Sequence, residues 1–413
     1  MEIFKINSSK FKSIYISYNF TLEVKNKRLF SNNSVLASLL AKSSNKYNNQ
    51  KEIEKYLNLL YGANYDVNIE KLGDLYNLEF RMEFINKKYL PNNEDLLEKV
   101  ILFLNEMIYN PADWTDESIK REKEFIIERI NERKDEKLRY GIQRAEELLC
   151  KEEPFGIYLY GEKETVEKVD KKALKEAYDE LINSSITIVV SGNLDGYENI
   201  DKKIKQTFEN KCKSNKSIKD LVYNVRKNEV LDEEVIEYQD NTQSVLSMGL
   251  IIEDCEPKDF YALNLYNAIL GTTPSSKLFQ NVREKASLAY TVRSRYYRFK
   301  DIIVIYAGIN KENYKKTVNL IREQIDDMKK GKISKEEFNS AKDSLIADLL
   351  DWKDSKIAME KMKISNIVAF KNENISIDDM KENMKNVSME DVIKVANKVK
   401  LKKIFVLGGV TNE

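Results

Sequence analysis

Arg283 and Tyr290 are the residues whose types and spacing point most directly to chemistry. They stand seven residues apart, Arg283 at the expected end of a helix and Tyr290 near the start of the strand expected to follow it. Both side chains donate hydrogen bonds, and this placement would allow them to point into a single cleft. The alternative is structural, because cations favour helix C-termini and strands commonly hold half-buried aromatic residues.

The 413-residue chain contains no histidine. A Ser-His-Asp triad, a Cys-His dyad and a histidine-based zinc site are therefore excluded. The three cysteines, Cys150, Cys212 and Cys255, form no C-x-x-C pair, which fits a reducing cytoplasm rather than a disulfide scaffold. Cys255 lies between two acidic residues, which should raise the pKa of its thiol, so we do not expect a nucleophile there.

The composition limits the classes of partner. Lys and Arg together number 68, as do Asp and Glu, and this balance argues against a dedicated nucleic-acid-binding protein. The segment 291–300 mixes basic and aromatic residues and could stack single-stranded nucleic acid. Two other interpretations of this segment fit a chain without net charge better than nucleic-acid binding does. It could form the wall of a chamber that attracts acidic groups, or it could be a solvated strand face. No stretch resembles a signal peptide or a membrane span, so we expect a cytoplasmic protein without a membrane partner.

The elements that would position Arg283 and Tyr290 are a helix over 274–285 and two strands that start near 288 and 301. A proline suits the first turn of this helix, and the strands are rich in Val, Ile and Tyr. Elsewhere, Thr115 should cap a long helix that reaches about residue 149. The Ser-x-x-Glu at 334 and the Ser-x-x-Asp at 388 predict capping boxes of two further helices.

The pattern of elements repeats once along the chain. Thr115 and Ser334, which each precede a long helix, are separated by nearly the same length of chain as Asp170 and Ser388, which each precede a shorter one. The repeat predicts two homologous α+β domains, residues 1–215 and 237–413, joined by a polar linker at 216–236. Because both halves place strands before long helices, we expect mostly antiparallel or mixed sheets with helices packed on one face.

The stretch 276–290 resembles a signature of the insulinase-like (pitrilysin-type, processing-peptidase-like) zinc peptidases, S-x-L-F-x-x-(L/V)-R-E-K-x-x-L-A-Y. The resemblance is strong over 240–353 and weaker over the rest of the chain. It implies two duplicated α+β domains that form half of a clamshell chamber, and it implies that Arg283 and Tyr290 bind the peptide and stabilise the transition state at its carbonyl oxygen. The matching residues are Ser276, Leu278, Phe279, Val282, Arg283, Glu284, Lys285, Leu288, Ala289 and Tyr290.

Active members of this family bind zinc through H-x-x-E-H on the first helix, where the Glu polarises the attacking water, and through a Glu on a later helix. Here Ser34 and Ser38 fill the two His positions and Ala37 fills the catalytic Glu position. Arg129 fills the later ligand position, with Glu128 as the alternative alignment. The resemblance therefore implies a degenerate site without a metal, because an arginine repels a cation.

The chain is thus similar to the non-catalytic subunits of the family, which contribute the Arg/Tyr pair to a partner that carries H-x-x-E-H. This implies a bacterial-type heterodimer with metalloendopeptidase activity on peptides, zinc in the partner, and no activity of this chain alone; a homodimer is possible in isolation. One alternative is a structural or peptide-binding protein of the same fold. Another is an independent metallopeptidase with carboxylate ligands only, against which the first helix offers no acidic cluster.

Overall fold

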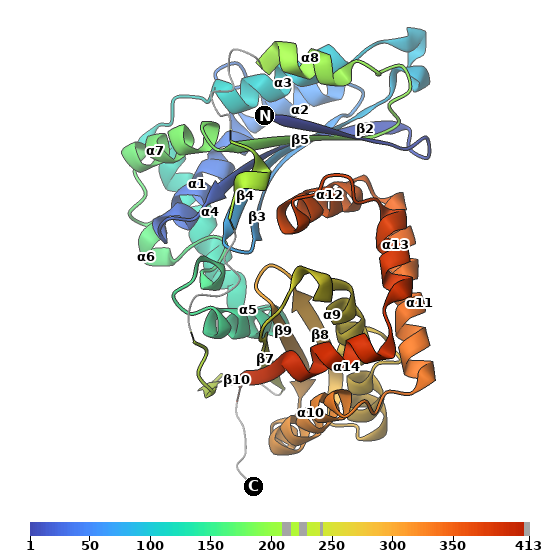
Figure 1. Ribbon diagram of the computed structural model, residues 1–413. Coiled ribbons are helices and arrows are strands. Elements are labelled where there is room, and N and C mark those ends of the chain that lie inside the picture. The colour runs from blue at the N-terminus through green and yellow to red at the C-terminus, as the bar shows by residue number, and fades with distance from the viewer. Residues whose placement is uncertain (209–215, 223–228, 240–242, 409–413) are drawn as a thin grey trace. The chain divides into compact units, whose positions relative to one another are not determined.

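Two five-stranded sheets with the same strand order organise the chain (Figure 1). In each sheet the outermost pair, β1 with β5 or β6 with β10, is parallel, and the other pairs are antiparallel. The predicted α+β fold and its duplication are therefore confirmed. The first sheet has the order β1-β5-β2-β4-β3 and is built from β1 (Glu2–Asn7), β2 (Ser13–Glu23), β3 (Asn64–Leu72), β4 (Leu75–Ile85) and β5 (Ser185–Gly192). The second has the order β6-β10-β7-β9-β8 and is built from β6 (Glu233–Glu237), β7 (Ser244–Ile252), β8 (Ala289–Tyr297), β9 (Ile302–Ile309) and β10 (Val399–Leu407).

This computed structural model describes residues 1–208, 216–222, 229–239 and 243–408. The chain divides into two compact units, and neither unit is continuous in sequence. The first unit comprises Met1–Asn131, Ile157–Tyr223 and Asp354–Glu373. The second unit comprises Glu132–Gly156, Asn224–Lys353 and Asn374–Glu413.

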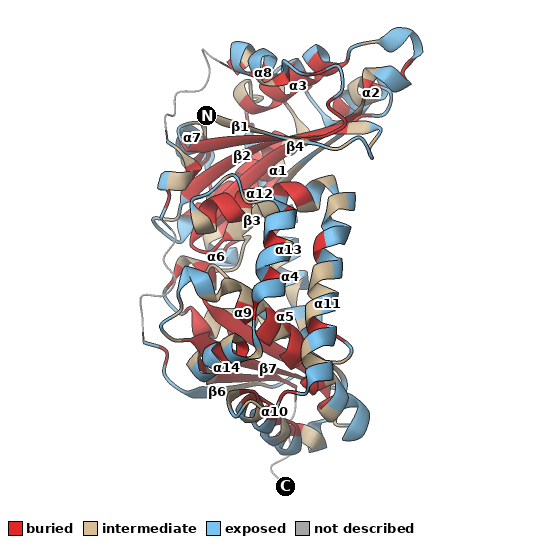
Figure 2. Ribbon diagram, turned by 45° about the vertical axis from the view of Figure 1, so that its right-hand side comes forward, coloured by how far each residue is buried: buried red, intermediate tan, exposed pale blue. Residues whose placement is uncertain are grey.

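The first unit is organised around the apolar face of its sheet. Alternate residues of β2, namely Ile14, Ile16, Tyr18 and Phe20, enter one core with apolar side chains of α1, α3 and α7, as the period of two in a strand requires. Figure 2 shows the central strands of this sheet as buried. The helices of the unit are α1 (Arg28–Lys42), α2 (Gln50–Leu59), α3 (Leu97–Tyr109), α4 (Asp116–Asn131), α6 (Lys163–Val166), α7 (Lys171–Ile182), α8 (Ile200–Phe208) and α12 (Lys356–Phe370).

The second unit repeats this arrangement. Leu246, Met248 and Leu250 of β7 share a core with apolar residues of α9, α10 and α14. Two segments, η7 (Ala268–Thr272) and η8 (Leu278–Lys285), are wound as π-helix, a form that is rare and frequent at functional sites. The helices of the unit are α5 (Lys137–Leu149), α9 (Phe260–Asn267), α10 (Tyr314–Lys329), α11 (Lys335–Asp351), α13 (Ile377–Asn386) and α14 (Met389–Lys398).

Helices α5 and α12 each pack on the sheet of the unit formed mainly by the other half of the sequence. They begin at Lys137 and Lys356, with the same spacing that separates Thr115 from Ser334, so they are equivalent elements of the repeat. Helix α5 approaches β7 closely at Gly141, where a Cβ atom would lie 2.6 Å from Cγ1 of Val245. Helix α12 contacts the first sheet through Glu360. Each sheet therefore carries one such helix on the face opposite its main core.

The predicted elements are largely confirmed, including the strands at 289–297 and 302–309 and both capping boxes. The single long helix from Thr115 to about residue 149 is wrong. Thr115 caps α4 as expected, but the chain leaves the helix after residue 131 and starts α5 at Lys137. The reason is tertiary, because α4 belongs to the first unit and α5 to the second.

Two other predicted segments have different bounds or contents in the structure. The helix predicted over 274–285 begins only at Leu278. The polar linker predicted over 216–236 contains the short helix η5 (Ile218–Asp220) and most of β6, which pairs with β10. Residues 223–228 of the predicted linker lie outside the described part of the chain. Within the described residues, no helix is long and apolar enough to cross a membrane.

Candidate functional site

Ser34 and Ser38, which the resemblance places at the two histidine positions of the zinc signature, lie one turn apart on α1. Ser34 is buried and its hydroxyl donates to the carbonyl oxygen of Ser31 at 3.0 Å. The hydroxyl of Ser38 donates to Oε2 of Glu122 on α4 at 2.7 Å. Ala37, between them, belongs to the apolar core of the first unit. The fold thus brings Ser38 and Glu122 together, while Ser34 is engaged by the backbone.

Glu122 is a fully buried carboxylate that is already satisfied by protein groups. The ammonium of Lys42, one turn after Ser38 on α1, donates to Oε2 at 2.5 Å, and Nε of Arg121 donates to Oε1 at 3.0 Å. Burial raises the pKa of Glu122, but the hydrogen bonds from Lys42, Ser38 and Arg121 outweigh it and hold the pKa below its ordinary value. Lys42 therefore supplies the positive charge beside this carboxylate.

Arg129 and Glu128 are exposed, and Arg129 borders the cluster, because its guanidinium and the ammonium of Lys42 both lie over the ring of Phe125. The guanidinium of Arg129 donates to the hydroxyl of Tyr160 at 2.8 Å and lies 5.0 Å from the ring centre of Phe125. Two serine hydroxyls and a carboxylate bound to Lys42 do not suit a zinc ion, which prefers imidazole, thiolate or free carboxylate ligands. Among the described residues, no group of three or more Cys, Asp or Glu is arranged to hold a metal ion.

The Arg/Tyr motif lies at the junction of η8 and β8 in the second unit. Its apolar and small residues serve the core, because Ser276, Leu278 and Val282 are buried. The backbone N–H of Leu288 donates to the carbonyl oxygen of Val282 at 3.0 Å and closes the turn that follows η8. Arg283 and Tyr290 remain exposed. The motif therefore combines buried residues that pack in the core with two residues that face solvent.

Tyr290 is held at a bulge of the edge strand β8. The pairing with β9 shifts between Ala289 and Thr291, which places Tyr290 out of the regular ladder. Its ring covers Gly308 of β9, where a Cβ atom would lie only 2.0 Å from Cζ of Tyr290. Partial burial raises the pKa of the Tyr290 hydroxyl above its ordinary value. The side chain is 45% exposed, and its hydroxyl has no hydrogen-bond partner among the described residues.

Arg283 lies in the last turn of η8 and makes weak local contacts. Its Nε lies 3.4 Å from Oε1 of Glu284, and its guanidinium lies 4.7 Å from the ring centre of Phe279. The side chain is 43% exposed, so these contacts cost little to break. No bond joins Arg283 to Tyr290 within the described residues. A guanidinium fork and an unpaired phenol are thus available for an external acceptor.

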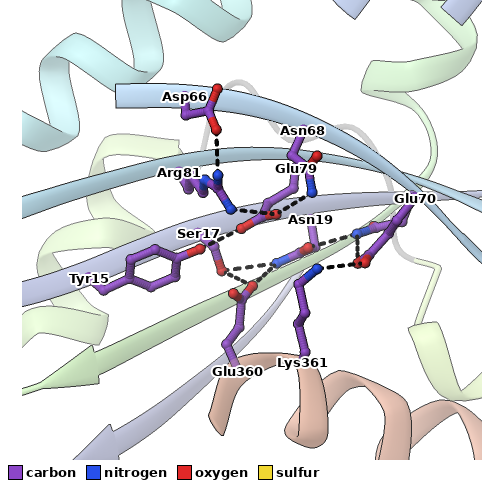
Figure 3. Close-up of polar contacts among 11 residues, drawn as sticks. Tyr15, Ser17, Asn19, Asp66, Asn68, Glu70, Glu79, Arg81, Glu360 and Lys361 are labelled. Atoms are coloured by element: carbon purple, nitrogen blue, oxygen red, sulfur yellow. Dashed lines mark hydrogen bonds and ion pairs between the residues drawn. The ribbon is translucent and has the colours of Figure 1, made fainter. Parts of the chain in front are cut away.

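A polar network on the first sheet is a feature that sequence reasoning missed (Figure 3). Glu360 of α12 accepts hydrogen bonds from the hydroxyl of Ser17 and from Nδ2 of Asn19, the latter at 2.9 Å. Beside it, the hydroxyl of Tyr15 donates to Oε1 of Glu79 at 2.5 Å. All of these side chains are buried or nearly so. The network fastens α12 to β2 and β4.

Glu79 and Glu360 bring two carboxyl groups into one buried place. Burial and the charge of Glu79 raise the pKa of Glu360 to about 8, so Glu360 holds a proton at neutral pH. Burial also raises the pKa of Glu79, although Tyr15 and Arg81 oppose this effect. The signal in the sequence was the alternation of polar residues in the two strands: Tyr15, Ser17, Asn19 and Thr21 in β2, and Asn77, Glu79, Arg81 and Glu83 in β4.

Comparisons with known proteins identify a matching family and several relatives. Residues 168–345, which include Arg283 and Tyr290, match the family described as the Peptidase M16 inactive domain. The probable inactive metalloprotease YmfF of Bacillus subtilis is 28% identical over 98% of this chain and 95% of its own length. An uncharacterized zinc protease of Rickettsia felis is 24% identical over 73% of this chain and 72% of its own length.

Solved structures share the fold across the chain. A conserved protein from Enterococcus faecalis V583 aligns with a TM-score of 0.87 and 23% identity, covering 100% of this chain and 97% of that protein. A peptidase M16 inactive domain from Pseudomonas fluorescens aligns with a TM-score of 0.77 and 15% identity, covering 99% of this chain and 96% of that protein. The chain is thus similar over residues 168–345 to the Peptidase M16 inactive domain and over nearly its whole length to a probable inactive metalloprotease, and it shares its fold with these solved structures.

Proposed function

We propose that this chain is the non-catalytic subunit of a heterodimeric zinc metallopeptidase that acts on peptides. Its partner would be a homologous subunit that carries H-x-x-E-H and zinc. Arg283 would bind the peptide, and the Tyr290 hydroxyl would stabilise the oxyanion that forms at the scissile carbonyl. Alone, the chain would cleave nothing, and it could pair with itself when the partner is absent.

One contrast supports this proposal above all others. Ser38, which the resemblance assigns to a zinc ligand, is bound in a Ser38–Glu122–Lys42 cluster of paired side chains, whereas Tyr290 is exposed with its hydroxyl unpaired among the described residues. A buried cluster of this kind has a structural role. An exposed arginine and tyrosine at the edge of a sheet can meet an extended peptide, whose main chain adds to such an edge with little sequence preference.

Reconstitution with an H-x-x-E-H subunit from the same genome tests the proposal. We expect the purified chain to show no stoichiometric zinc and no peptidase activity, and the mixture to cleave an unstructured peptide. Tyr290→Phe and Arg283→Ala should each lower kcat/KM of the mixture, by about 10²-fold for the loss of an oxyanion donor.

Two exposed residues of the same types serve as controls. Tyr89→Phe and Arg139→Ala alter side chains that are also exposed but lie outside the motif, and they should leave activity unchanged. If all four variants support full activity, the Arg/Tyr role is wrong, and the alternative of a structural or peptide-binding protein is favoured.

A further inference from the structure

Strand β8 carries two exposed arginines that have no acidic partner. It is an edge strand of the second sheet, and Arg293 and Arg295 are exposed on it. Among the described residues, neither guanidinium forms an ion pair or a side-chain hydrogen bond. Arg144 of the same unit, by contrast, is paired with both Glu147 and Glu237. The two guanidinium groups on β8 are therefore available to an external ligand of opposite charge.

The two arginines share one face of the sheet with Tyr290. Arg293 stands opposite Tyr306 of β9, and directly opposite residues project from the same face. Gly308 is two residues beyond Tyr306 and has the same orientation, and the ring of Tyr290 covers it. Arg295, two residues beyond Arg293, also projects from this face. Tyr290, Arg293 and Arg295 thus line one side of the edge strand, and we call them the β8 strip.

Helix α5 packs on the same face but leaves most of the β8 strip uncovered. It packs against β7, β9 and β10 and approaches β8 at Tyr297, where burial and the nearby charge of Glu146 raise the pKa of the tyrosine hydroxyl. The guanidinium of Arg295 lies 4.9 Å from the ring centre of Tyr297, so Glu146 moderates the positive charge at that end. Arg293 lies on the other side of Arg295, toward Tyr290.

The residues that precede β8 add to the positive charge of the strip. Residues 283–295 contain four basic side chains, those of Arg283, Lys285, Arg293 and Arg295, and one acidic side chain, that of Glu284. All five are exposed, so the segment presents an excess of three positive charges to solvent. Because the whole chain has no net charge, this excess is a local feature, and it would attract an anionic ligand to this edge of the sheet.

We infer that the β8 strip binds an extended peptide that carries carboxylate side chains at alternate positions. Arg293 and Arg295 stand about 7 Å apart on one face, and two carboxylates at positions i and i+2 of an extended peptide have the same spacing. A guanidinium can pair with each carboxylate through two parallel hydrogen bonds. The inference rests on the proposed function for its substrate, because Tyr290 would then place the acidic residues a few positions from the scissile bond.

Fluorescence anisotropy with the full chain at low ionic strength tests this inference. The probe is a labelled, acetylated and amidated unstructured peptide with two Glu residues separated by one neutral residue. An isomer with the two Glu residues adjacent and an analogue with Gln in place of Glu serve for comparison. We expect the first peptide to bind at least about 5-fold more tightly than the Gln analogue, since two exposed charge pairs are gained, and more tightly than its isomer.

Substitutions of the two arginines should change this preference in a defined direction. Arg293→Gln/Arg295→Gln should remove the preference for Glu, and Arg293→Glu/Arg295→Glu should transfer it to a peptide with Lys at the same positions. Both side chains are exposed, so the unfolding temperature should stay unchanged. The matched control Arg139→Gln/Arg322→Gln alters two exposed arginines of the same unit and should preserve the preference.

Three peptide results would overturn the inference: equal binding of the Glu and Gln peptides, equal binding of the two Glu isomers, or equal loss in the two Arg→Gln double variants. Tighter binding of an oligothymidylate of the same charge would also overturn it and would favour single-stranded nucleic acid.

The assay needs no partner subunit, so its outcome is separable from that of the proposed peptidase function. A reconstituted mixture that cleaves peptides without preferring the acidic one would contradict the inference and leave the proposed function intact. Selective binding of the acidic peptide by a chain whose reconstituted mixture cleaves nothing would support the β8 strip and contradict the peptidase function.

Discussion

At the scale of single residues, a salt bridge between Lys42 and Glu122 lies beside Ser38, a position where the resemblance to zinc peptidases expects a metal ligand. Glu122 is buried on α4, and Lys42 and Ser38 of α1 bind the same oxygen. The sequence contains no histidine, and its resemblance to the zinc peptidases places Ser34, Ala37 and Ser38 at the positions of the zinc signature. It did not show that Lys42 would take the charge-balancing position, because Lys42 and Glu122 are 80 residues apart in the chain.

Lys42→Met tests whether this lysine stabilises the first unit. At pH 7 we expect a loss of about 1–3 kcal/mol, because a buried carboxylate loses its main charged donor. The pKa of Glu122 is held low in the folded state, so its stabilisation is present at neutral pH and disappears as the pH falls through the folded pKa. The defect should therefore shrink in acid. Denaturant unfolding measures it, and Lys120→Met, at an exposed pair with Glu124, should have almost no effect.

Gly308 leaves the space on β9 that the ring of Tyr290 occupies. It lies in a strand and has no positive φ, so alanine is compatible with the backbone, but the added Cβ would collide with the ring of Tyr290. Gly308→Ala should therefore displace the ring toward solvent and lower the pKa of its hydroxyl toward the ordinary value. Tyrosine-labelled NMR, with Tyr290→Phe to assign the signal, measures this titration. An unchanged titration would show that the ring does not depend on Gly308.

At the scale of elements, α12 is held on the first sheet by buried polar contacts in addition to its buried apolar residues, such as Ile364 and Ile367. Ser17, Asn19 and Glu360 form its central contact, and Lys361 forms an ion pair with Glu70 at 3.1 Å. Some buried polar atoms on this face, including the hydroxyls of Thr187 and Ser191, have no partner among the described residues. Such a face is costly to bury, and its stability should depend on the protonation of Glu360.

The pH dependence follows from the raised pKa of Glu360. Its folded value of about 8 lies above its ordinary value of 4.5, so the folded state binds the proton more tightly. Stability is then fully present below about pH 4.5 and is lost as the pH rises to about 8. Glu360→Gln keeps an acceptor for Ser17 and Asn19 but cannot ionise, so the variant should be more stable than the natural chain at pH 9, by about 1 kcal/mol or more.

Unfolding by denaturant at pH 5, 7 and 9 measures this difference. The advantage of Glu360→Gln should grow with pH, whereas the exposed substitution Glu98→Gln should give the same small change throughout. A difference that stays constant with pH would contradict the assignment of a raised pKa to Glu360.

At the scale of the whole molecule, the two halves of the sequence exchange one helix each. The first unit contains α12 from the second half, and the second unit contains α5 from the first half. The near-constant spacing between matching positions of the two halves makes these helices recognisable as equivalents. It could not assign them to a sheet, because an amphipathic helix specifies the kind of surface it covers and not which of two similar surfaces that is.

A fragment of residues 1–215 tests the consequence. It would lack α12 over its polar sheet face and would expose the apolar side of α5, including Tyr140, Ala145 and Leu149. We expect lower amide-hydrogen protection in β2 and β5 than in the intact chain, and a tendency to aggregate. Addition of a fragment of residues 216–413 should restore protection. Equal protection in the isolated fragment would show that the exchanged helices contribute little.

The sequence by itself determined the absence of histidine, the duplication and most strands, because these follow from residue identity and local periodicity. Only the tertiary structure decided where the chain breaks between α4 and α5 and that Lys42 pairs with Glu122. It also decided that the Tyr290 ring packs over Gly308 and that Glu360 is buried against Asn19. Those features depend on contacts between distant segments, 341 residues apart for Asn19 and Glu360. Local patterns do not encode which distant partner a polar side chain will meet, and the balance of burial and charge at each contact is set only when both partners are in place.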